Sequence, residues 1–192
     1  MEIELLITDF DGTLVNTFEA NYQAYREALG LHGIELSKER YRECFGFRFD
    51  RFMDAMGIQD AELRKEIRNE KARLYPTYFN HLKVNTALID FIRAFHLGGG
   101  KTAIASTARK ENLMNALRYI GAVEDFDLII AGEDVEKGKP DPEIYLKSIQ
   151  HFNVSPEKAL VFEDSEVGIK AAEKAGIRYI KNHLLIFLRD RT

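Results

Sequence analysis

The sequence has little cysteine, no long apolar run and no large excess of one charge, and each of these absences excludes a class of protein. Cys44 is the single cysteine among 192 residues, so the chain cannot form an internal disulfide, which fits a reducing compartment. The longest apolar run, residues 184–188, is far too short to cross a bilayer. Lys and Arg total 27 against 31 for Asp and Glu, and the net charge of -4 does not indicate a nucleic-acid surface.

The sequence also shows no repeat and no low-complexity stretch, and we expect no signal peptide, since the first apolar run predicts a strand. We therefore expect a cytoplasmic protein that contacts neither membrane nor nucleic acid, and we expect it to be a monomer. Its length suits one large domain, or one core with a small insertion.

The most informative stretch is an apolar run over residues 3–8 that ends in Asp9, Asp11 and Gly12. Branched apolar residues predict a buried strand, and side chains two positions apart on a strand point the same way. Asp9 and Asp11 should therefore converge at the carboxyl end of this strand, where open parallel sheets bind ligands. Two carboxylates so close repel each other and need a cation or a shared proton. The alternative is a polar turn that merely closes the strand.

The same two carboxylates suit two chemical roles. Asp9 can attack as a nucleophile beside a hard cation such as Mg²⁺. Asp11 can carry a proton to or from an oxygen.

The pattern divides the chain into two parts. Residues 17–83 contain no convincing strand and predict several helices, with N-caps at Ser37 and Asp60 and an interruption at Pro76. Beyond them we expect Thr86 to cap a further helix. Strands and helices then alternate, which predicts parallel βαβ units in a doubly wound α/β sheet. The predicted strands cover residues 102–105, 128–131, 159–162 and 178–181, and the predicted helices cover residues 109–120, 142–152 and 166–175.

This pattern predicts an α/β core of residues 1–15 and 84–192, with a helical insertion of residues 16–83 directly after the first strand. An insertion at that place can act as a lid that closes on substrate and excludes water. The alternative is a helical subdomain that only adds stability.

Three further stretches place polar groups at the ends of predicted strands. Ser106 follows the strand at 102–105 and can donate to a phosphate oxygen, unless it is a simple helix cap. Lys139 lies between Gly138 and Pro140, where a rigidly held cation can neutralise a phosphate, although loop lysines are ordinarily surface charge. Glu163 and Asp164 end the strand at 159–162. Together with Asp9 and the Asp11 carbonyl they could complete a Mg²⁺ site, and Asp164 or Ser165 could at the same time cap the next helix.

In this order the four stretches resemble the four signatures of the haloacid dehalogenase (HAD) superfamily of phosphohydrolases and phosphomutases. The resemblance covers nearly the whole chain and implies a HAD-like doubly wound parallel sheet, with a small all-helical cap inserted after the first strand. The matching residues are Asp9, Asp11, Gly12 and Thr13, then Ser106, then Lys139 before Pro140, and finally Glu163, Asp164, Ser165 and Gly168.

The resemblance implies a Mg²⁺-dependent phosphatase that hydrolyses a small phosphorylated metabolite through an aspartyl-phosphate on Asp9. It also implies substrate contacts from Thr107 and Arg109, and from Arg48 in the cap. The helical cap resembles the β-phosphoglucomutase-like branch, which makes a phosphomutase the alternative. However, the mutase has a histidine where this chain has Asn21, and that difference favours hydrolysis. A non-catalytic phosphate-binding protein is the third hypothesis.

The end of the chain, residues 182–192, is unlike the family. We expect this apolar segment to cover the sheet edge, the alternative being that it pairs with a second copy.

Overall fold

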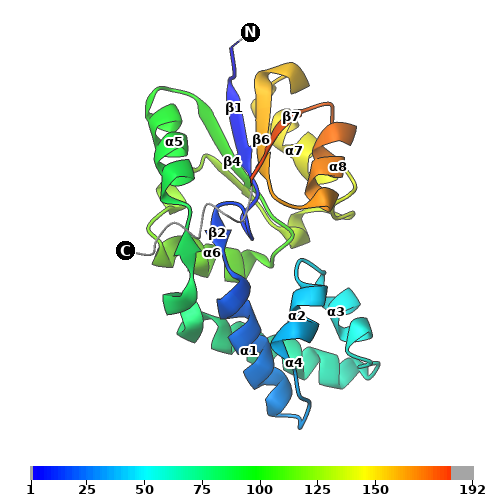
Figure 1. Ribbon diagram of the computed structural model, residues 1–192. Helices are drawn as coiled ribbons and strands as arrows, with labels where there is room; N and C mark the ends of the chain where they lie inside the picture. The colour runs from blue at the N-terminus through cyan, green and yellow to red at the C-terminus, as the bar shows by residue number, and fades with distance from the viewer. Residues whose placement is uncertain (1, 183–192) are drawn as a thin grey trace. The chain divides into compact units, whose positions relative to one another are not determined.

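The computed structural model describes residues 2–182, and its main feature is a five-stranded, wholly parallel sheet (Figure 1). The strand order is β5-β4-β1-β6-β7, so the first strand of the chain lies in the middle. Parallel pairing sets Thr8 opposite both Ile104 and Phe162, which brings the carboxyl ends of β1, β4 and β6 side by side. The strands are β1 (Leu5–Thr8), β4 (Lys101–Ala105), β5 (Leu128–Ile130), β6 (Ala159–Glu163) and β7 (Arg178–Lys181).

Helices cover both faces of this sheet. On one face α7 packs against β1, β4 and β5, and α8 packs against β6 and β7. On the other face α5 packs against β4, and its Phe91 ring lies 5.9 Å from the ring of Phe162 on β6. The predicted doubly wound α/β sheet is therefore confirmed. The helices are α5 (Thr86–Leu97), α6 (Lys110–Tyr119), α7 (Glu143–Phe152) and α8 (Glu166–Lys174), with short 3₁₀ helices at Val123–Asp125, Gly132–Asp134 and Pro156–Lys158.

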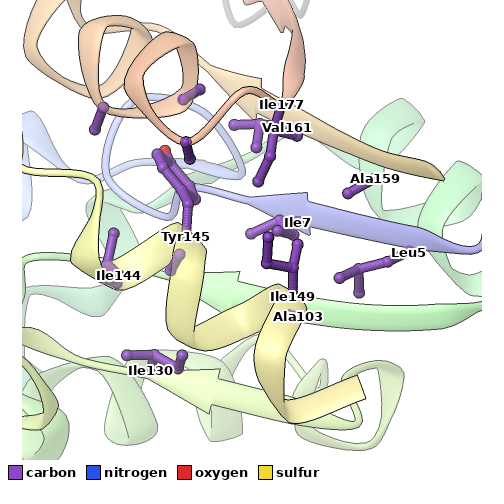
Figure 2. Close-up of a cluster of buried hydrophobic side chains, with 14 of the residues drawn as sticks. Leu5, Ile7, Ala103, Ile130, Ile144, Tyr145, Ile149, Ala159, Val161 and Ile177 are labelled. Atoms are coloured by element: carbon purple, nitrogen blue, oxygen red, sulfur yellow. The ribbon is translucent and has the colours of Figure 1, made fainter. Parts of the chain in front are cut away.

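The core explains why β1 is buried along its whole length and begins with three apolar residues. Alternate residues of a strand point to opposite faces, and both faces of this sheet are covered. Leu5 and Ile7 of β1, with Val161 of β6, face Tyr145 and Ile149 of α7 in one buried cluster (Figure 2). Each large apolar side chain buried in this way stabilises the fold by about 1.5–3 kcal/mol.

Residues 17–82 form a second compact unit, which is wholly helical. Its predicted N-caps are confirmed: Ser37 Oγ accepts the Arg40 N–H at 3.0 Å, and Asp60 Oδ1 accepts the Leu63 N–H at 2.7 Å. Pro76 interrupts the last long helix, as expected, and a 3₁₀ helix follows. The elements are α1 (Phe18–Gly30), α2 (Lys38–Cys44), α3 (Phe49–Ala55), α4 (Ala61–Leu74) and the 3₁₀ helix Tyr75–His81.

A two-stranded ribbon that the sequence pattern did not reveal flanks this unit. Strand β2 (Val15–Asn16) pairs antiparallel with β3 (Lys83–Val84), so the chain enters and leaves the insertion at adjacent points. The expectation of no strand up to residue 83 is therefore wrong at its last position. Two residues are too few to show the alternation from which strands are predicted.

The expected cap of α5 is also wrong by one position. Asn85 is the N-cap, and its Oδ1 accepts the Leu88 N–H at 3.2 Å, whereas Thr86 is the first helical residue. Asn and Thr are both good caps, and only the backbone path distinguishes them.

Two expectations concern the membrane and the end of the chain. Across residues 2–182, every helix is too short or too polar for a membrane span. The C-terminal segment 182–192, expected to cover the sheet edge, lies outside the described residues from residue 183 onward.

Candidate active site

The turn that follows β1 carries the first residues of the candidate site. It is closed by two backbone hydrogen bonds, from Gly12 N to the Val15 carbonyl at 2.8 Å and from Val15 N to the Phe10 carbonyl at 3.0 Å. Gly12 has φ of +94°, a conformation that favours glycine. A Cβ at this position would lie 2.2 Å from Asp164 Oδ2, so glycine also lets that carboxylate approach the turn.

Asp9 is the first residue beyond β1, and its buried side chain is paired with a buried lysine. Lys139 Nζ lies 2.7 Å from Asp9 Oδ1 and 3.0 Å from Glu163 Oε2. The Lys139 side chain is only 3 % exposed, although it comes from the loop before α7. Lys139 is therefore no surface charge, but the counter-ion of two buried carboxylates.

Glu163, the last residue of β6, accepts hydrogen bonds on both carboxylate oxygens. Oε2 accepts from Lys139 Nζ and, at 3.0 Å, from the Tyr145 hydroxyl. Oε1 accepts from the backbone N–H and the hydroxyl of Ser165. Glu163 is 1 % exposed, and a Cβ on Gly168 would overlap it. Hydrogen bonds to both oxygens and close packing against Gly168 therefore fix the Glu163 carboxylate.

Asp164 is held less completely. Its Oδ1 accepts the Thr13 hydroxyl at 3.0 Å, which links the first and fourth sequence stretches. The N-cap of α8 is Ser165, whose Oγ accepts the Gly168 N–H at 3.1 Å, so Asp164 does not cap the helix. Asp164 therefore retains oxygen lone pairs for a ligand.

Oxygen atoms of Asp9, Glu163 and Asp164 lie within 4.8 Å of one another. Burial, with the Glu163 charge nearby, raises the pKa of Asp9 well above its ordinary value, although Lys139 opposes the rise. Burial and Glu163 also raise the pKa of Asp164 to about 6. Burial would lower the pKa of Lys139, but the Asp9 and Glu163 charges raise it instead. Three carboxylates around one ammonium leave an excess negative charge that suits a divalent cation.

Ser106 lies beside this cluster through the strand register. It follows β4, whose end adjoins the end of β1, and its N–H donates to the Ile130 carbonyl at 3.0 Å. The Ser106 hydroxyl is buried and accepts the Ala108 N–H at 3.1 Å. That bond leaves its O–H free to donate to a ligand oxygen.

The remaining predicted residues occupy more open positions. Asp11 is half-buried in the turn, bridged to Val15. Thr107 is half-buried in the loop before α6, and Arg109, the N-cap of α6, is paired with Glu133 at 3.4 Å. Arg48 belongs to the helical unit, at the N-cap of α3.

Three residues that form hydrogen bonds to the site were not predicted from the sequence. Asn85 Nδ2 and Asn182 Nδ2 both donate to the Thr13 carbonyl, at 3.3 and 2.9 Å, and so hold the turn from two distant parts of the chain. No sequence signal indicates either asparagine. Tyr145 did carry a signal, because it ends the Lys-Pro-x-Pro-Glu-x-Tyr pattern that Lys139 begins.

A family model for haloacid dehalogenase-like hydrolases matches residues 6–181. The chain belongs to this family. The match confirms both the predicted family and the predicted enzyme class, and phosphatases among its relatives agree with action on phosphoric monoesters.

Three relatives illustrate the similarity. A phosphorylated carbohydrates phosphatase of Thermotoga maritima is 31 % identical over 93 % of this chain and 84 % of its own. The structure of CbbY from Rhodobacter sphaeroides in complex with phosphate has a TM-score of 0.84 at 28 % identity, over 95 % of this chain and 88 % of its own. A candidate β-phosphoglucomutase of Thermotoga maritima has a TM-score of 0.71 at 30 % identity, over 97 % and 90 %. The expected β-phosphoglucomutase-like branch agrees with these neighbours.

The close approach of Gly12 to Asp164 can be tested with two glycine variants. Gly12→Ala and Gly33→Ala both place alanine at positive φ, but a Cβ at Gly33 has no atom within 4 Å. If the acidic cluster holds a divalent cation, we expect Gly12→Ala to displace the Asp164 carboxylate and weaken the binding of that cation about 10-fold or more, measured by calorimetry with Mg²⁺ as the probe. Gly33→Ala should bind the probe cation with the affinity of the wild type, and equal affinities in the two variants would contradict a role for the close approach of Gly12 to Asp164 in cation binding.

The raised pKa of Asp164 predicts a pH-dependent stability of the metal-free protein. Because the pKa of about 6 in the folded state exceeds the unfolded value, the stabilising contribution of protonated Asp164 is present at low pH. It is lost as pH rises through about 6. Asp164→Asn should therefore raise the free energy of unfolding at pH ~7.5 by about 1–2 kcal/mol, measured by urea denaturation in EDTA.

At pH ~4.5 the same substitution should bring a much smaller gain, because Asp164 is then largely protonated in the folded protein. A gain that does not change with pH would show that the charge is not its cause.

Proposed function

We propose that this hydrolase is a Mg²⁺-dependent phosphatase of a small phosphate monoester and acts through an aspartyl-phosphate on Asp9. The observation that carries the proposal is the buried Asp9 carboxylate, paired with Lys139 at 2.7 Å and flanked by Glu163 and Asp164. A carboxylate at a strand end, beside a fixed cation, is placed to act as a nucleophile toward an anionic phosphate.

The substrate class follows from the relatives. The Thermotoga maritima protein is named for phosphatase activity on phosphorylated carbohydrates, and the CbbY structure holds phosphate. We therefore propose a sugar phosphate or a similar phosphorylated metabolite as the substrate. The single cysteine leads us to propose, in addition, a cytoplasmic location, and we propose a monomer as the default assembly.

The acidic cluster fits a magnesium ion. Asp9 and Asp164 have oxygen lone pairs available, and the Asp11 carbonyl lies on the same turn. Glu163 adds negative charge beside the cation, while its own oxygens already accept four hydrogen bonds. Bound Mg²⁺ would neutralise the carboxylates and the phosphate oxygens as they come together.

In the first step the Asp9 carboxylate attacks phosphorus, and the bond from phosphorus to the ester oxygen breaks. Asp11 donates a proton to the departing oxygen, which leaves as an alcohol. Lys139 and the Ser106 hydroxyl donate to the phosphoryl oxygens as negative charge spreads over them.

In the second step Asp11 takes a proton from a water molecule, which attacks phosphorus and releases inorganic phosphate. Asp9 returns to its carboxylate form, still paired with Lys139. Asp11 thereby regains the proton that it gave to the alcohol in the first step. The net reaction is hydrolysis of the phosphate ester.

We also propose that the helical unit, residues 17–82, acts as a lid that excludes water during the first step. Its support is its place in the chain, shortly after the strand end and turn that carry Asp9 and Asp11. Arg48 in this unit, with Thr107 and Arg109 in the core, are the proposed substrate contacts.

Asp9→Asn provides the direct test. We expect phosphate release from an aryl phosphate in Mg²⁺ to fall by about 10³-fold or more, because an amide cannot form the acyl phosphate. Asp90→Asn, on the exposed surface of α5, is the matched control and should keep full activity. Retained activity in Asp9→Asn would refute the nucleophile assignment.

Two further assays distinguish the phosphomutase and the phosphate-binding hypotheses from the phosphatase. Conversion of glucose 1-phosphate into glucose 6-phosphate with a bisphosphate primer, without net phosphate release, would identify a mutase. The absence of turnover on a broad panel of phosphate esters would identify a binding protein instead.

A further inference from the structure

Tyr145 is a buried side chain that the proposed mechanism does not use. It is 0 % exposed, and its hydroxyl donates to Glu163 Oε2 at 3.0 Å. Its ring centroid lies 5.1 Å from Lys139 Nζ. Figure 2 shows the side chain extending from α7 among the core residues, near Ile7 of β1. A phenylalanine would fill the same volume, so the hydroxyl calls for an explanation of its own.

The hydroxyl completes the set of donors around Glu163. A carboxylate offers about four lone-pair positions, and Glu163 accepts from four donors on Lys139, Tyr145 and Ser165. With every position filled, the carboxylate has one stable orientation. The Tyr145 hydroxyl and Lys139 Nζ share the same oxygen, Oε2, so the two donors fix each other's direction of approach.

Lys139 in turn joins Glu163 to the proposed nucleophile. Its ammonium lies 3.0 Å from Glu163 Oε2 and 2.7 Å from Asp9 Oδ1. A lysine side chain has many rotamers, and only its partners select one of them. The orientation of Glu163 therefore decides where the ammonium stands relative to Asp9.

We propose that Tyr145 is a positioning residue, whose hydroxyl orients Glu163 and through it places Lys139 against Asp9. The kinetic consequence rests on the proposed phosphatase function, but the geometric one does not. If the ammonium is misplaced, charge stabilisation in the transition state weakens, while ground-state binding of the substrate changes less.

Tyr145→Phe removes the hydroxyl alone and keeps the ring and its packing. We expect kcat for phosphate release to fall about 10-fold, with KM changed less than about 3-fold, since small displacements of catalytic groups cost up to about 10²-fold in rate. The matched control is Tyr179→Phe, which removes a hydroxyl that donates to Glu173 at 3.2 Å on the surface. The control should leave both constants unchanged, and an unchanged kcat in Tyr145→Phe would overturn the proposal.

A double-mutant cycle distinguishes positioning from a general effect on the core. If Tyr145 acts through Glu163, adding Tyr145→Phe to Glu163→Gln should reduce kcat by less than about 2-fold. An equal loss in both backgrounds would mean that the hydroxyl acts independently of Glu163, and the proposal would fail.

Crystal structures of the wild type and Tyr145→Phe test the geometric claim without any activity. The proposal predicts Lys139 Nζ within hydrogen-bond distance of Asp9 in the wild type and displaced beyond about 3.5 Å in the variant. An undisturbed pair would overturn it. Absence of phosphatase activity in the wild type would refute the proposed function and leave this comparison valid. If Tyr145→Phe does not fold, the same measurement is made on Glu163→Gln. The proposal predicts that Lys139 Nζ moves away from Asp9 in this variant as well, and an unchanged Lys139–Asp9 distance would overturn it.

Discussion

The ammonium of Lys139, buried between Asp9 and Glu163, is the interaction on which the site depends. Burying charges is costly, and a buried ion pair persists only where further hydrogen bonds satisfy each partner. Tyr145 and Ser165 supply these bonds for Glu163. With Asp164 nearby, the carboxylates still outnumber the ammonium. The fold thus maintains a concentrated negative charge that a bound cation would relieve, and this is the physical reason to expect metal-dependent chemistry.

The sheet order is what brings the charged groups together. Because β1 lies between β4 and β6, residues at the carboxyl ends of three strands far apart in sequence reach one edge of the sheet. Asp9, Ser106 and Glu163 occupy that edge, and the loop before α7 brings Lys139 to it. The apolar faces of these strands are buried under helices, so the core that stabilises the sheet also fixes the separation of the functional groups.

Local patterns predicted most of the fold because they report local physics. Apolar runs located the strands of the sheet, and capping residues such as Ser37 and Asp60 located helix starts. The strand ends also indicated Asp9 and Glu163 as site residues. Contacts across the fold could not be predicted in the same way. Two examples are the hydrogen bonds from Asn85 to the Thr13 carbonyl and from Tyr145 to Glu163. Both depend on how distant segments of the chain pack.

The most direct test of the account is to identify the residue that carries phosphate during turnover. Borohydride reduces an acyl phosphate to an alcohol, which converts phosphorylated aspartate into homoserine. The enzyme would be quenched in acid during turnover of a sugar phosphate in Mg²⁺, reduced, digested and analysed by mass spectrometry. If Asp9 is the nucleophile, we expect homoserine at position 9 and unmodified Asp11. Unmodified Asp9 during active turnover, or labelling at another residue, would contradict this assignment.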